Sequence, residues 1–147
     1  MTDSNSEQKR TLSTALKRGY SENELAHMYE LARFLLETGG IEDGTVILKG
    51  INAVAPNYVP ALLALCHVHV ISKNHTKALQ LASRAVELEP ESVDARLFLI
   101  SAHLLVRDLQ TAGTMLGEVG EAIESGINIS SAALRLYRAH RARFETI

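Results

Sequence analysis

The chain has 147 residues, a formal net charge of −2 and one cysteine, Cys66, so it can bury a core unaided and cannot form an intramolecular disulfide. The near-neutral charge gives no electrostatic basis for binding nucleic acid or for attachment to a membrane surface. Three prolines, no tryptophan and long runs of leucine and alanine predict an all-α protein.

The polar N-terminus has no apolar run behind it, which argues against a signal peptide. The longest apolar-rich segment, residues 60–71, is too short to cross a bilayer. We therefore expect a cytoplasmic protein without membrane insertion. Residues 1–20 are expected to be a flexible extension that can hold a short helix around Leu12 and Leu16.

Every predicted element after this extension is a helix, because no segment alternates apolar and polar residues as a strand does. Ser21 and Glu24 have the spacing of a capping box. Asn57, Ser92 and Ser130 are expected to cap later helices in a similar position. The predicted helices cover residues 22–37, 41–54, 58–71, 77–89, 93–106, 109–124 and 128–145.

The same pattern recurs every 34 residues. Pro56 and Pro90 are 34 residues apart, and each ends the second helix of a pair. A period of 34 with two helices per unit is the signature of tetratricopeptide repeats. The shift aligns Leu31 with Leu65 and Leu99, Ala32 with Cys66, Gly44 with Ala78 and Ala112, and Leu48 with Ala82 and Leu116.

Residues 22–126 resemble the tetratricopeptide family at its consensus positions. The second repeat fits best, with Leu62, Leu65, Cys66, Ala78, Ala85 and Pro90, and it departs at His69 and Ala82. The first repeat departs at Leu35, Gly44 and Ile51, and the third at Arg96, Ile100 and Glu124. The resemblance implies an α-solenoid of three helix pairs, at 22–56, 57–90 and 91–126, followed by a capping helix within 127–147.

No catalytic motif is present: the chain has no P-loop, GxGxxG, GxSxG or HExxH. His67 and His69 lie two residues apart and so point to different sides of a helix, which is unsuited to chelating one metal ion. Cys66 sits at a small-residue packing position, where a buried and inert thiol is expected. We therefore expect no enzyme activity, no cofactor and no metal site.

The resemblance implies that the first helix of each pair lines a concave groove. The residues assigned to that groove are mostly apolar, which suits an apolar helix or extended segment of a protein partner. Repeat arrays that bind a partner's C-terminal carboxylate carry Lys, Asn and Arg at matching positions, and only Arg33 of that set is present, so such a clamp is disfavoured. The predicted groove residues are Tyr29, Arg33, Leu36, Leu63, His67, Val70, Ile71, Leu97, Phe98, Ser101, Leu104 and Leu105.

Residues 25–48 are similar in layout to the first repeat of the small chaperones of bacterial type III secretion. That resemblance implies a chaperone holding an apolar segment of a secreted, needle, translocator or export-apparatus subunit. The alternative is a structural adaptor or a self-associating scaffold, as a homodimer or heterodimer. The extension, the last helix or a second copy could also fill the groove. Arg135, Arg138 and Arg141 form a secondary basic surface, or else the solvated side of the capping helix.

Overall fold

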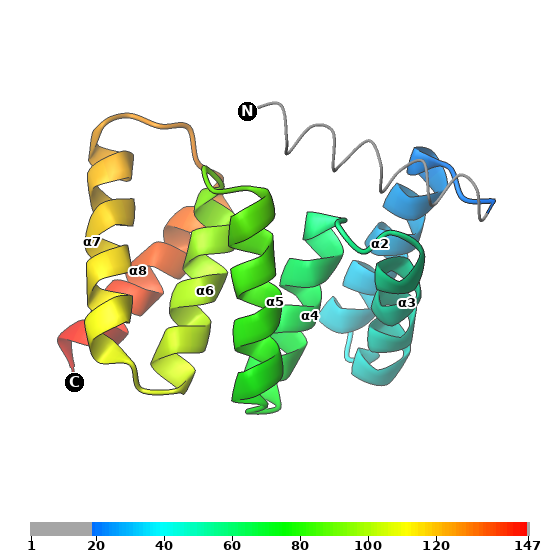
Figure 1. Ribbon diagram of the computed structural model, residues 1–147, viewed down its shortest axis with the longest axis horizontal. Coiled ribbons are helices and arrows are strands. Elements are labelled where there is room, and N and C mark those ends of the chain that lie inside the picture. The colour runs from blue at the N-terminus through cyan, green and yellow to red at the C-terminus, as the bar shows by residue number, and fades with distance from the viewer. Residues whose placement is uncertain (1–18, 147) are drawn as a thin grey trace.

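The computed structural model describes residues 19–146, and this part of the chain folds entirely into helices (Figure 1). Its helices are α2 (Glu22–Glu37), α3 (Ile41–Val54), α4 (Val59–Ile71), α5 (His75–Leu88), α6 (Val93–Leu105), α7 (Leu109–Glu124) and α8 (Ser131–Glu145). The short helix expected around Leu12 and Leu16 lies outside the described residues. Among the described helices, none combines the length and apolarity that a bilayer crossing requires.

The helices form a row of helix pairs. Helix α2 packs on α3, α4 on α5, and α6 on α7, and each second helix also contacts the first helix of the next pair. The first helices contact one another as well, α2 with α4 and α4 with α6. Helix α8 extends this row, because it contacts both α6 and α7. The N-terminal pair and α8 therefore lie at opposite ends of the molecule (Figure 1).

Side-chain caps start most of the helices that the sequence predicts. The hydroxyls of Ser21, Ser92 and Ser130 each accept a hydrogen bond from the backbone amide three residues later, at 3.1–3.2 Å. The cap expected at Asn57 is wrong. Its side-chain oxygen instead accepts from the Arg84 guanidinium at 2.6 Å, and α4 begins at Val59 without a side-chain cap.

The turn inside each pair uses one backbone conformation three times. Gly39, Lys73 and Arg107 are spaced by 34 residues and have φ of 95°, 59° and 62°. A left-handed conformation costs little for glycine and more for residues with a Cβ atom. The first repeat therefore has the residue that the turn favours, and the second and third repeats hold a basic residue there under strain.

Small residues set the spacing within the pairs. A Cβ atom on Gly44 would lie 3.0 Å from the carbonyl oxygen of Ala32 and 3.1 Å from a methyl group of Leu36. This close approach of α3 to α2 explains why Gly44 departs from the alanine of the family pattern. In the next pair Ala78, at the equivalent position, is fully buried, as is Ala82.

Two glycines of α7 allow α8 to pack closely against that helix. A Cβ atom on Gly113 would lie 2.8 Å from the ring of Phe144, and one on Gly120 would lie 2.7 Å from the hydroxyl of Tyr137. Both aromatic side chains pack onto the core cluster that includes residues of α6 and α7. The bare backbone at these positions is what lets α8 lie close enough to join that core.

Candidate protein-binding face

The predicted groove residues lie on α2, α4 and α6, the row of first helices. We call the part of this row that remains accessible the first-helix face. Arg33, His67 and Ile71 are exposed, with Ile71 at 58%. The other members are partly buried. The first-helix face carries Tyr29, Arg33, Leu36, Leu63, His67, Val70, Ile71, Phe98 and Leu105.

Three residues assigned to the groove are not available on that face. Leu97 and Leu104 are buried, at 0% and 5% exposure, in the core cluster that Ala133 of α8 joins. The Ser101 hydroxyl lies 2.7 Å from Nε2 of His140 on α8. The assignment of Leu97 and Leu104 to an open groove is therefore wrong, because α8 covers the side of α6 that carries them, whereas Ser101 is partly buried and its hydroxyl contacts α8.

The aromatic groups of the first-helix face contact one another across helices. The rings of Tyr29 and Tyr58 lie 6.2 Å apart in an edge-to-face arrangement. His67 on α4 and Phe98 on α6 make a second edge-to-face contact, also at 6.2 Å. Such contacts fix the orientation of side chains that are only partly buried. The face is thus pre-formed around rigid aromatic groups at both of its helix junctions.

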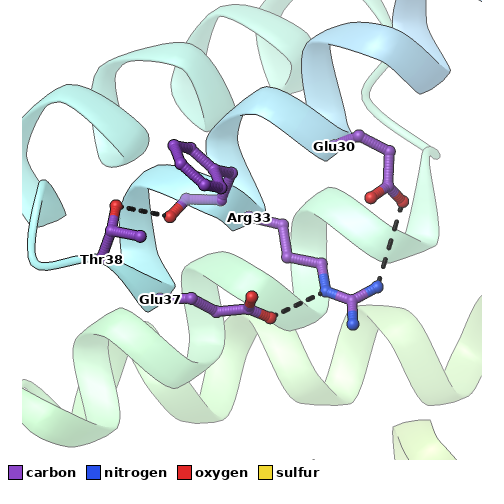
Figure 2. A network of polar contacts seen from close by, with 5 residues as sticks. Glu30, Arg33, Glu37 and Thr38 are labelled. Atoms are coloured by element: carbon purple, nitrogen blue, oxygen red, sulfur yellow. Dashed lines mark hydrogen bonds and ion pairs between the residues drawn. The ribbon is translucent and has the colours of Figure 1, made fainter.

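The guanidinium of Arg33 on the first-helix face is already engaged. Nε of Arg33 lies 3.1 Å from Oε1 of Glu37, and its guanidinium lies 4.0 Å from Oε1 of Glu30 (Figure 2). The hydrogen bond that Arg33 donates to Glu37, together with the charges of both carboxylates, raises the pKa of Arg33. Two carboxylates surround one guanidinium, so this part of the face carries a net negative charge.

A third carboxylate lies near enough to affect the same region. Burial raises the pKa of Tyr29; Arg33 opposes that rise, while Glu30 and then Asp94 of α6 add to it. Asp94 thus acts on a side chain of α2 although α4 lies between the two helices in the row. The face combines aliphatic and aromatic groups with an acidic border, and it offers no free cation for a partner's carboxylate.

Burial shifts the pKa of the thiol and of two imidazoles near the first-helix face. Burial raises the pKa of the Cys66 thiol to about 12, so Cys66 is the buried, unreactive thiol that its position predicts. Burial lowers the pKa of His67 and, with help from Lys77 and Lys49, that of His69. Within residues 19–146 no group of three or more His, Cys, Asp or Glu side chains is arranged to hold a metal ion.

A cavity of about 560 Å³ lies on a different surface. It runs along α5 and reaches the end of α6, so it belongs to the second helices rather than the first. The residues that line it are His75, Thr76, Leu79, Gln80, Ser83, Arg84, Glu87 and Val106. Six of these eight side chains are of polar type, but the surface that they present to the cavity is mainly apolar, and none of the eight belongs to the predicted groove.

The basic side chains of α8 lie on its solvent side. Arg135, Arg138 and Arg141 are all exposed. Arg141 is paired with Glu145 at 3.2 Å, whereas no ion pair within the described residues holds Arg135 or Arg138. The buried side of α8 is formed by Ala133 and His140.

Solved structures with a similar fold support this architecture. A mutant form of MamA superposes with a TM-score of 0.58 at 17% identity, over 99% of this chain and 91% of that chain. A second structure, MamA MSR-1 C2, gives a TM-score of 0.58 at 15% identity, over 99% of this chain and 89% of that chain. No protein-family model matches the sequence, and no curated protein matches it significantly. At these identities the likeness shows the fold alone, an all-α helical-repeat solenoid.

The sequence-based prediction missed three residues that lie at the first-helix face. Glu30 and Glu37 were not assigned to the site, although their spacing of three and four residues from Arg33 is a readable signal for ion pairing on a helix. Tyr58 was also missed. It precedes α4 and faces Tyr29 only because the first two helix pairs pack together, and no local spacing reports that contact.

Proposed function

We propose that the protein is a non-catalytic interaction module that holds a helical or extended segment of a protein partner on its first-helix face. The observation that carries this proposal is the exposure of Ile71, at 58%, beside the edge-to-face pair of His67 and Phe98. Exposed apolar groups next to fixed aromatic rings favour burial of an apolar side chain.

The charge of the face selects among partner segments. Glu30, Glu37 and Asp94 outnumber Arg33, so an acidic partner would meet repulsion at the α2 end. An apolar segment with a lysine or arginine placed near these carboxylates meets attraction instead. The preferred partner is thus apolar with a basic residue, and a chain that presents its C-terminal carboxylate there is disfavoured.

Between the two functions that the sequence suggests, we favour the adaptor or scaffold. Helix α8 closes the α6 end of the predicted groove, which leaves a shorter face than a chaperone for a long apolar segment would use. The likeness in fold to MamA is compatible with this choice. The type III secretion chaperone rests on the layout of residues 25–48 and on the general plan of three repeats with an N-terminal extension, a capping helix and an apolar groove.

Site-specific photocrosslinking tests the proposal in the cells that make the protein. A photoreactive phenylalanine replaces Ile71 on the first-helix face or, as a matched control, Val46, which is 68% exposed on α3. We expect a discrete crosslinked protein from position 71 and none from position 46. The adduct should disappear when His67→Glu is added. Equal crosslinking from both positions, or an adduct that His67→Glu leaves unchanged, would refute the proposal.

A further inference from the structure

The N-terminal end of the solenoid has an apolar surface that other repeats bury. Leu31 is 52% exposed and Phe34 is 60% exposed. The residues 34 and 68 positions after Leu31 are Leu65 and Leu99, which are only 3% and 9% exposed. The same position is therefore buried in the second and third repeats and open in the first.

The internal repeats show what covers this position. Leu65 belongs to the cluster that contains Leu48 and Ile51 of α3, the helix that precedes its own pair. Leu99 belongs to the cluster that contains Ala78 and Ala82 of α5, again the preceding helix. Leu65 and Leu99 each therefore pack on the preceding helix, which presents alanine or larger aliphatic side chains. Leu31 and Phe34 form a surface suited to one more helix.

The opposite end of the molecule presents a helix of that kind. On α8, residues 135, 138, 139 and 142 are all exposed and fall at the i, i+3, i+4, i+7 spacing of one helix face. That face carries Arg135, Arg138, Ala139 and Ala142. Leu99 packs on alanines of α5, and this face of α8 presents the same residue type. The methylene groups of the arginine side chains add apolar surface beside these alanines.

The two ends also have opposite charge. Residues 19–56 hold six carboxylates, Glu22, Glu24, Glu30, Glu37, Glu42 and Asp43, against the two bases Arg33 and Lys49. Helix α8 holds four arginines against Glu145 alone. Charge complementarity of this kind orients and accelerates association. Because the ends face away from each other (Figure 1), they cannot meet within one copy.

We propose that the chain associates head to tail, with the Arg135–Arg138 face of α8 in one copy docking on Leu31 and Phe34 of α2 in the next. Such a contact joins two different surfaces, so it leaves a free surface at each end and grows by further addition. The occupant of the N-terminal apolar surface is a second copy of this chain. The first-helix face remains free for a partner in every copy.

Two surface variants test the proposal because each blocks one end. The N-face variant combines Leu31→Ser with Phe34→Ser, and the C-face variant combines Arg135→Glu with Arg138→Glu. All four positions are exposed, so both variants should keep the helical content of the unchanged chain. Val46→Ser, at an exposed position of α3, is the matched control for loss of a surface apolar group.

Sedimentation over a concentration series gives the result. The unchanged chain and the control should form species larger than a dimer, and raising the salt from about 50 mM to about 500 mM should weaken them several-fold. Each variant alone should be monomeric. An equimolar mixture of the two should give a heterodimer and nothing larger, because each variant retains one working end.

Several results would overturn the proposal. One is an unchanged chain that stays monomeric throughout the series, and another is a mixture of the variants that gives no heterodimer. Deletion of residues 1–18 provides a further arm. If that deletion converts a monomer into an assembling protein, the chain's own N-terminal segment covers Leu31 and Phe34, and the proposal is wrong. His67→Glu should leave self-association unchanged, which separates this test from that of the proposed function.

Discussion

Glycine-to-alanine substitutions on α7 should have opposite effects according to whether α8 lies over the position. Gly117 has no heavy atom within 4 Å of a Cβ placed on it, so Gly117→Ala should stabilise the protein by about 0.5–1 kcal/mol through helix propensity alone. At Gly113 and Gly120 the same Cβ would lie 2.8 and 2.7 Å from the aromatic side chains of α8. Overpacking of that kind costs about 1–3 kcal/mol.

The net result for Gly113→Ala and Gly120→Ala is a change between roughly neutral and about 2.5 kcal/mol destabilising. Each should therefore be less stable than Gly117→Ala by about 1–3 kcal/mol. Urea unfolding followed by far-ultraviolet circular dichroism measures the three free energies of unfolding. If all three alanine variants are stabilised alike, α8 does not pack on α7 as described, and the closure of the α6 end of the first-helix face is wrong.

Three further predictions follow from the turns, the buried histidine and the covered groove. Lys73→Gly and Arg107→Gly should each raise the free energy of unfolding by about 0.5–1 kcal/mol, because they remove the strain of a left-handed backbone conformation. Gly39→Ala should lower it by about 1 kcal/mol, because it introduces that strain. Urea unfolding of the three variants measures the sign of each change. Burial lowers the pKa of His140, so the unfolded chain binds the proton more readily and stability should fall as pH drops below about 6.5, by at most about 1.4 kcal/mol per pH unit. Unfolding midpoints at neutral and mildly acidic pH measure this, and a loss of the same size in His140→Gln would contradict the assignment to His140. Leu104→Glu should unfold the C-terminal part of the chain because it buries a charge, whereas Ile71→Glu should leave helicity intact; circular dichroism of the pair separates core from surface.

The fold was predictable because its signals are local and repeated. The 34-residue spacing of Leu31, Leu65 and Leu99 encodes the pairing of helices, and Ser21, Ser92 and Ser130 mark helix starts by short-range hydrogen bonds. The Asn57 cap failed for a tertiary reason. The Arg84 side chain, 27 residues away, donates a hydrogen bond to the side-chain oxygen of Asn57, and no local sequence pattern indicates that contact.

The candidate site was predictable only in part. Register along the repeat placed His67 and Ile71 on an accessible face, but the same register placed Leu97 and Leu104 there as well. Their burial depends on where α8 packs. That in turn depends on Gly113 and Gly120, whose lack of a side chain gives no positive sequence signal.

Methyl nuclear magnetic resonance with a selected peptide tests the central claim most directly. Peptides selected for binding to the purified protein should be apolar with a basic residue. A bound peptide should shift the methyl signals of Leu36, Leu63 and Ile71 and leave those of Val46 unchanged. Shifts centred instead on Leu79 and Val106, beside the cavity of α5, would contradict the assignment of binding to the first-helix face.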